Sequence, residues 1–211
     1  IDNVSITGFG TGVHVAGYNG LTPRPGSDGR NDRTTLRNSR IVGNIGFGWL
    51  GGGDGDLVEN NYFEDNGVDS VFDHNIYYSG YRPTIGSVIR GNELYRAVVR
   101  SAANPGSCDA VSFVSHGNHT NFVIEDNYIH EDIGAATGNC WGIAIDPGNG
   151  MAAEAFKGLI IRRNRVVNVG PLAIGCASCT DAIIENNVIV HEQGFSFYTA
   201  ISVPDKTRDA S

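Results

Sequence analysis

Lysine, methionine and leucine are scarce in this chain. Its 211 residues include two lysines, one methionine and few leucines. These residues are good helix formers, so their scarcity argues against a helical bundle or a coiled coil. The chain also has no run approaching the roughly 18 apolar residues that a membrane-spanning helix requires. No positively charged segment followed by an apolar one opens the sequence, so we expect a segment of a longer or processed chain.

Basic residues are also in the minority. The chain has 15 Lys and Arg against 23 Asp and Glu, a net charge of −8. Sequence-independent binding of nucleic acid requires a cationic surface, which this balance disfavours. It also disfavours polyanionic substrates unless a bound cation or local Arg residues offset the field.

Glycine and asparagine are abundant instead. There are 29 Gly and 20 Asn, and hydrophobic residues make up 40% of the chain, too many for a disordered protein. This composition predicts a turn-rich, all-β protein. The length suits a single domain, which we assign to residues 1–211.

A short frame recurs along the chain: an apolar residue, two further residues, usually Asn, one residue, and a second apolar residue. Clear copies occupy 58–63, 89–94, 124–129, 161–166 and 184–189. Weaker copies carry Ser39 and Thr7 in the position of the Asn. These positions recur every 22 to 37 residues, so we take 22 or 23 residues as one bare coil and assign the excess to inserted loops.

Each frame is followed by a second short strand in which apolar residues alternate with others. The middle residues of these strands are His14, Gly48, Tyr77, Ser112, Ala144, Ala173 and Ser202. The alternation places the outer members of each triplet in the core and the middle one outside. Short strands joined by Gly- and Asn-rich bends at this period predict a parallel β-solenoid of about seven coils.

The combination of an Ile-x-x-Asn-x-Ile frame with a Gly-Ile-x-Ile strand resembles the parallel β-helix repeats of the pectin-lyase-like superfamily, over nearly the whole chain. The resemblance implies a single-stranded right-handed parallel β-helix with three parallel sheets and an Asn ladder at one bend. It implies little about activity, because the superfamily includes lyases, hydrolases, epimerases, tailspikes and adhesins. The Asn residues themselves favour a structural role, because Asn tolerates left-handed backbone and hydrogen-bonds to its neighbours.

Four cysteines, an even number, fit an oxidising compartment. Cys108 and Cys140 each lie three residues before a second strand, so both fall in the same column of adjacent coils. Strands are about 4.8 Å apart, and disulfides accept Cα separations of about 4.4 to 6.8 Å. We therefore predict a Cys108–Cys140 disulfide. Cys176 and Cys179 flank one turn and are expected to close a local ring, with a free or metal-binding pair as the alternative.

The same alignment places His74 and Asp109 in one column, two residues before Ile76 and Val111. A carboxylate beside an imidazole raises the pKa of the imidazole and fixes its tautomer, as a general base or acid requires. The alternative is a polar pair that terminates the sheet. The candidate catalytic residues are His74, Asp109, Arg100, Tyr77 and His116. The candidate substrate-binding residues are His14, Asn75, Tyr81, Arg82, Ser112 and Asp146.

These candidates are expected to line one groove. The residues predicted to point outward from the Gly-Ile-x-Ile sheet are His14, Asn75, Tyr77 and Ser112, those at its exit edge are His116 and Asp146, and those on flanking inserts are Tyr81, Arg82 and Arg100. The longest inserts fall between residues 79 and 154, and binding sites are commonly built on such loops over a rigid scaffold. A groove with aromatic rings and mixed charges suits sugar rings.

Resemblance to lyases implies a base, commonly Lys or Arg, that removes the proton alpha to a uronate carboxylate, with calcium or Arg neutralising that carboxylate. Lys157 precedes a first strand, away from the expected groove, so Arg100, His74 or a Tyr would have to substitute. The segment 52–56 resembles part of a calcium-binding nonapeptide, but Leu57 stands where the next acid should be, which favours a plain Gly-rich turn. No cofactor is assigned, and Ca²⁺ is the candidate to test.

Our first hypothesis is a secreted or cell-surface carbohydrate-active protein that binds a polysaccharide, or cleaves or epimerises it, along the Gly-Ile-x-Ile sheet. The second is a non-catalytic structural module of a tailspike, adhesin or extracellular filament. We expect a polysaccharide partner, no nucleic-acid partner and no membrane span. Because an uncapped solenoid end exposes unpaired strand edges, we also expect end-to-end self-association or flanking domains.

Overall fold

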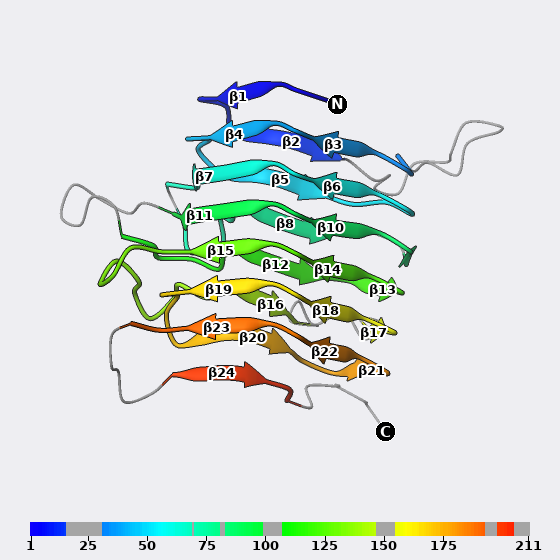
Figure 1. Ribbon diagram of the computed structural model, residues 1–211. Helices are drawn as coiled ribbons and strands as arrows, with labels where there is room; N and C mark the ends of the chain where they lie inside the picture. The colour runs from blue at the N-terminus through cyan, green and yellow to red at the C-terminus, as the bar shows by residue number, and fades with distance from the viewer. Residues whose placement is uncertain are drawn as a thin grey trace.

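The chain folds into short parallel strands stacked in one direction. The structure is a computed structural model that describes residues 1–15, 31–68, 70–80, 83–98, 107–146, 155–192 and 198–204. These residues form 24 strands and no helix, and all of the strand pairings between them are parallel. Among the described residues, there is no helix long and apolar enough to cross a membrane. The strands descend in order from the N-terminal to the C-terminal end (Figure 1).

The strands form four sheets. Sheet A contains β3 (Thr35–Arg37), β6 (Leu57–Glu59), β10 (Val88–Arg90), β14 (Val123–Glu125), β18 (Ile160–Arg162) and β22 (Ile183–Glu185). Sheet B contains β1 (Ser5–Thr7), β4 (Arg40–Val42), β7 (Tyr62–Asn66), β11 (Glu93–Ala97), β15 (Tyr128–His130), β19 (Arg165–Val167) and β23 (Val188–Val190). Sheet C contains β2 (Thr11–Val15), β5 (Phe47–Gly51), β8 (Ile76–Ser79), β12 (Phe113–His116), β16 (Ile143–Ile145), β20 (Leu172–Cys176) and β24 (Thr199–Ser202). Sheet D contains β9 (Thr84–Ile85), β13 (Asn118–Thr120), β17 (Ala155–Lys157) and β21 (Cys179–Thr180).

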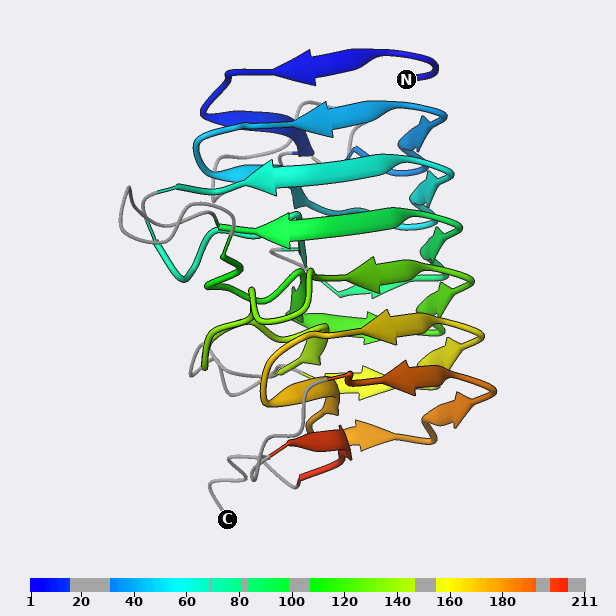
Figure 2. The same cartoon turned by 60° about the vertical axis from the view of Figure 1, so that its left-hand side comes forward.

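The chain visits these sheets in a fixed order. It passes from sheet B to sheet C, then directly or through sheet D to sheet A, and back to sheet B; we call one such circuit a rung (Figure 2). This arrangement is compatible with the parallel β-solenoid predicted from the repeat. Sheets A, B and C correspond to the three expected sheets, and the short sheet D is an addition that the sequence pattern did not predict.

The bends from sheet A to sheet B contain two residues and hold the predicted Asn ladder. The first bend residue has a positive φ, as in Asn60 (55°), Gly91 (63°) and Asp126 (57°), which Gly, Asn and Asp tolerate best. The second carries the ladder, in which each side-chain Nδ2 donates to the Oδ1 of the next residue at 3.0 Å. The ladder runs through Asn61, Asn92, Asn127, Asn164 and Asn187.

Ser39 extends this ladder by one rung, but Thr7 does not. The Ser39 N–H donates to the Asn61 Oδ1 at 3.0 Å, as its position in the frame predicts. Thr7 pairs with Val42, and it is Val4 whose N–H donates to Ser39 Oγ at 3.1 Å. The prediction for Thr7 is wrong by three residues, because the bend in this copy of the frame is formed by Asn3 and Val4, with Val4 in the ladder position.

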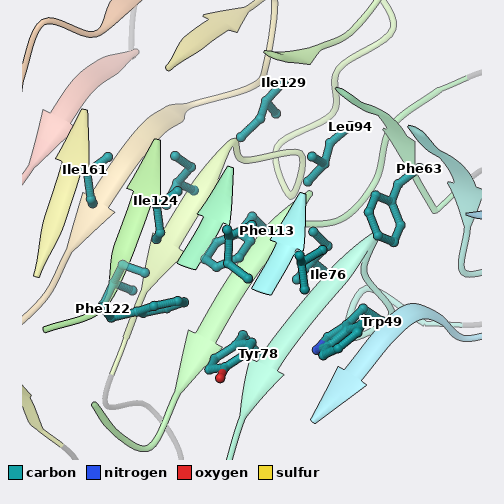
Figure 3. Close-up of a cluster of buried hydrophobic side chains, with 14 of the residues drawn as sticks. Trp49, Phe63, Ile76, Tyr78, Leu94, Phe113, Phe122, Ile124, Ile129 and Ile161 are labelled. Carbon is teal, nitrogen blue, oxygen red and sulfur yellow. The ribbon is translucent and has the colours of Figure 1, made fainter. Parts of the chain in front are cut away.

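The interior between the sheets is filled by the inward-facing row of each strand (Figure 3). Sheet C contributes Trp49, Ile76 and Phe113, and sheets A and B contribute residues such as Ile124 and Phe63, all of them fully buried. Each such side chain stabilises the fold by roughly 1.5 to 3 kcal/mol when it leaves water. The core therefore fixes which face of sheet C points outward.

A second, shorter polar ladder lies at the corner between sheets B and C. Asn44 Nδ2 donates to Asn66 Oδ1 at 2.8 Å, Asn66 Nδ2 donates to Asn75 Oδ1 at 2.9 Å, and Asn75 Nδ2 donates to Ser112 Oγ at 3.3 Å. Asn75 and Ser112 are completely buried. The prediction that they point outward is therefore wrong, and their hydrogen bonds are internal to the scaffold.

Close packing at the same corner explains why the Gly-Ile-x-Ile strand begins with glycine. A Cβ on Gly48 would lie 2.5 Å from the Asn75 carbonyl oxygen and 2.8 Å from the ring of Phe63. Gly142, one residue before β16, is equally crowded, with the Ala173 carbonyl oxygen at 2.5 Å. Only a residue without a side chain fits these two positions.

Candidate binding face on sheet C

Four aromatic rings make continuous contacts on the outward face of sheet C. Tyr77, from β8, is central: its ring centroid lies 5.4 Å from that of Phe47, 5.7 Å from His74 and 5.5 Å from His116. The Tyr77 and His74 rings are stacked, with an interplanar angle of 17°. Phe47, Tyr77 and His116 are each partly exposed. We call these four residues the aromatic cluster.

His74 is the buried member of this cluster. Its side chain is 4% exposed, and its Nδ1 lies 2.8 Å from the Val111 carbonyl oxygen. Because a carbonyl only accepts, Nδ1 carries the proton and the lone pair of the neutral ring is on Nε2. Burial lowers the pKa of His74 from 6.5 to about 4, so the ring is neutral near pH 7.

The predicted His74–Asp109 column does not form. Ile76 pairs with Phe113, not with Val111, so the register differs by two residues and His74 lies beside Val111. The Asp109 carboxylate instead accepts hydrogen bonds from Thr137 Oγ1 at 2.5 Å and Asn139 Nδ2 at 3.1 Å. A shift of two residues preserves the alternation of apolar residues, so the pattern alone does not distinguish the two registers.

Other candidates occupy the same face with different partners. His14 is exposed on β2, beside Leu50, and Leu50 lies beside Tyr77. His116 and Asp146 are adjacent at the exit edge, as predicted, but His116 Nδ1 contacts the Asp146 backbone oxygen. Three further candidates, Tyr81, Arg82 and Arg100, lie outside the residues that the structure describes.

One side of this face is bounded by the loops that lead from sheet B into sheet C. The predicted Cys108–Cys140 disulfide joins two of them, with a Cα–Cα distance of 5.4 Å. Cys108 forms an isolated bridge with Ala136, so the pairing is correct although the column used to predict it was shifted. The Cys176–Cys179 disulfide is also present and closes the local ring at the end of β20. We call the two joined loops, 107–112 and 131–142, the loop wall.

Trp141 belongs to the same face and was missed by the sequence analysis. It lies two residues before Ile143, the position that His74 holds relative to Ile76, and is partly exposed. With Ala144, Asp146 and Leu172 it lines a small depression of about 30 Å³. Extending the His74 alignment by one further strand would have identified Trp141.

A wider groove, of about 690 Å³, lies elsewhere, on the outside of the bend between sheets A and B. Arg40, Tyr62 and Glu93 of sheet B line it together with bend residues such as Asn38 and Asn60. The Arg40 guanidinium lies 4.5 Å from the centre of the Tyr62 ring and also pairs with Glu64. The sequence pattern indicated only a structural role for these positions. We call this surface the bend groove.

The Gly-rich segment 52–56 forms a turn held by a buried carboxylate. Asp56 is buried, and its Oδ2 accepts hydrogen bonds from the Gly53 N–H at 2.6 Å and the Tyr78 hydroxyl at 3.2 Å. Its Oδ1 accepts from the Thr34 N–H at 2.9 Å. The carboxylate therefore serves as a buried acceptor for the turn, as the plain Gly-rich turn predicts.

Comparison with known proteins adds no relative. No protein-family model, no curated protein and no solved structure matches this chain at a significant level. The functional argument therefore rests on the geometry of the two surfaces.

Proposed function

We propose that this protein is a secreted, right-handed parallel β-helix of about seven coils, related to the pectin-lyase-like superfamily, that binds a polysaccharide on the outer face of sheet C. The observation that carries the proposal is the aromatic cluster. Aromatic rings supply large, rigid contact surfaces, and their faces match the apolar C–H faces of sugar rings. Two disulfides in a chain of this size support the extracellular location.

The scaffold supports this use of the face. Parallel strands hold Phe47, Tyr77 and His116 in successive rungs, so the rings repeat along the stack as sugar units repeat along a chain. The disulfide-bonded loop wall contains Trp141, and its Val111 accepts the hydrogen bond from His74. Such a preordered face loses little conformational entropy when a ligand binds.

We propose binding, without proton abstraction, as the activity of this face. A general base near neutral pH works best when its pKa is near the working pH. The pKa of His74, about 4, is too low, and Asp109 is not beside it to raise it. The catalytic alternative is cleavage or epimerisation of a uronate polymer, and the experiment described below also tests for it.

A structural module remains the second candidate, and the last rung favours it. Ile184 and Ile189, in the inward rows of β22 and β23, are only partly buried, and Ile201 on β24 is 44% exposed although its partner Ile174 is fully buried. A further rung stacked on these strands would cover them and pair their backbone groups. That rung would come from a neighbouring segment or from a second copy of the chain.

Retardation in gels that contain a panel of neutral and uronate polysaccharides tests the proposal. We expect at least one polysaccharide to retard the protein, and Tyr77→Ala to weaken binding about tenfold, because an aromatic contact contributes about 1 kcal/mol beyond its area. Tyr62→Ala, in the bend groove, is the matched control and should bind normally.

Three results would change the assignment. Loss of binding in Tyr62→Ala but not in Tyr77→Ala would move the site to the bend groove. Release of unsaturated products, abolished in His74→Ala, would establish a lyase. No binding to any polysaccharide, together with a molecular mass that increases with protein concentration, would favour the structural module.

A further inference from the structure

A buried carboxyl group faces the disulfide of the loop wall. Cys108 and Cys140 are completely buried in a small cluster with Ala97, Val98 and Ala110. Glu131, at the start of the 131–142 loop, is 3% exposed, and one of its carboxyl oxygens lies within 4.8 Å of both sulfur atoms. Neither oxygen makes a complete hydrogen bond among the described residues, although the Arg96 backbone N–H acts on the carboxyl group.

This environment is unfavourable for Glu131 as it stands. A buried polar group without a partner costs about 1 to 3 kcal/mol, and an ionised one costs more. Burial raises the pKa of the Glu131 carboxyl well above its usual range, although the backbone N–H and the positive charge of Arg96 oppose this effect. A small apolar residue would avoid this cost, and a state in which the carboxylate gains a partner would reduce it.

We propose that the reduced form of the Cys108–Cys140 pair is a metal site, in which the two thiolates and the Glu131 carboxylate bind Zn²⁺ or a similar thiophilic divalent cation. Two thiolates and one carboxylate form a donor set suited to zinc, and three protein ligands leave a fourth position for water or another ligand.

The distances permit this with little movement. Tetrahedral zinc with bonds of about 2.3 Å to sulfur and 2.0 Å to oxygen places the sulfurs about 3.8 Å apart and each sulfur about 3.5 Å from the oxygen. The three ligand atoms already lie within 4.8 Å of one another, and the two Cα atoms are 5.4 Å apart. Opening the S–S bond requires rotation of the two cysteine side chains.

Backbone hydrogen bonds also hold the two cysteines, in addition to the disulfide. The Cys108 N–H donates to the Ala135 carbonyl at 2.9 Å, and the Cys108 carbonyl accepts from the Thr137 N–H at 3.0 Å. The Cys140 N–H donates to the Thr137 carbonyl at 3.2 Å. These bonds favour the same loop conformation after reduction, with the lower local stability that loss of the disulfide brings.

The chemistry balances with a phosphine as the reductant. The S–S bond takes up two electrons from the phosphine and two protons from water, giving two thiols, and the water oxygen forms the phosphine oxide. Binding of one divalent cation then displaces the two thiol protons, and the Glu131 carboxyl binds as the carboxylate. The resulting site has a net charge of −1, and the positive charge of Arg96 acts favourably on it.

Cobalt binding to the folded protein tests this site. A Cys176→Ser/Cys179→Ser background removes the other disulfide, so that reduction should yield two thiols per chain. We expect the reduced form to bind one Co²⁺ with thiolate-to-cobalt charge-transfer bands and tetrahedral d–d bands, and Zn²⁺ to displace it. The oxidised form should show neither band. Glu131→Gln should weaken Co²⁺ binding more than tenfold.

Controls keep the test independent of folding. Circular dichroism before and after reduction reports the fold, and Glu93→Gln, on sheet B, is a matched Glu substitution outside the site that should bind Co²⁺ normally. Failure of the phosphine to release two thiols from the folded chain would overturn the proposal. So would Co²⁺ binding no tighter than in a Cys108→Ser/Cys140→Ser variant, equal binding by Glu131→Gln, or a reduced chain that unfolds and does not refold with metal.

Discussion

At the scale of single residues, the Asn ladder shows how much a recurring side chain specifies. Asn127 accepts from the Asn92 N–H and Nδ2, each at 3.0 Å, and donates to the Ile89 carbonyl oxygen and to Asn164, also at 3.0 Å. One amide thus satisfies two backbone groups of the preceding rung and is bonded to the Asn side chains of both neighbouring rungs. This is why an Asn at a fixed place in the frame predicted the bend correctly.

Removing a central ladder residue should therefore be costly. We expect Asn127→Ala to lower the free energy of unfolding by about 2 to 5 kcal/mol, because it leaves the Asn92 N–H and the Ile89 carbonyl buried without partners. Asn187→Ala should cost less, because Asn187 is partly exposed. Urea unfolding measures both, and equal losses would contradict the ladder as a buried network.

Buried histidines give a prediction for acid stability. Burial lowers the pKa of both His74 and His119 from 6.5 to about 4. The unfolded chain therefore binds more protons than the folded one between these values, and stability should fall as the pH drops from about 6.5 to 4, by up to about 3 kcal/mol per group.

His74→Gln provides the measurement for this window. Urea unfolding at pH 7 and pH 4.5 should show a smaller loss of stability in this variant than in the wild-type protein, because Gln does not titrate. An unchanged pH dependence would show that His74 is not the buried, neutral group described above.

At the scale of elements, the sequence predicted the strands better than their register. The alternation of apolar residues correctly identified the side chains of β8 and β16 that point inward. The same alternation fits β12 in two registers, which differ by two residues. Because the connection from β11 to β12 is long, the number of residues between these strands does not determine which register forms. The structure settles the register through the corner ladder, in which Asn75 meets Ser112. No local pattern in the sequence marks that ladder.

The loop wall should depend on its disulfide. Cys108 and Cys140 are separated by 32 residues, for which the loop-entropy estimate is about 3 to 4 kcal/mol. Cys176 and Cys179 are separated by three residues, which gives about 2 kcal/mol. We expect Cys108→Ser/Cys140→Ser to lower stability more than Cys176→Ser/Cys179→Ser.

Hydrogen exchange followed by mass spectrometry adds the local result. Amides of 107–112 and 131–142 should exchange faster in the Cys108→Ser/Cys140→Ser variant, while those of β14 and β18 in sheet A should keep their protection. Uniform loss of protection would mean that the bond supports the whole stack and not the wall.

At the scale of the whole molecule, repetition makes the all-β parallel stack predictable from the sequence, and it hides the function. The same alternation that builds the core places side chains on three outer surfaces. The sequence directed attention to sheet C, where Tyr77 and His116 do meet, but it offered no sign of the bend groove around Tyr62. Contacts such as Asp109 with Thr137 depend on how the loops fold over the sheet, which spacing in the chain does not determine.

The central claim is that a polysaccharide lies on the outer face of sheet C. Of the two tryptophans, Trp141 is partly exposed on this face and Trp49 is fully buried in the core. Titration with a polysaccharide that retards the protein should change the intrinsic fluorescence in a saturable way. Trp141→Phe should abolish that change while the gel still shows binding. Retardation without any change in Trp141 emission would place the ligand elsewhere and contradict the account.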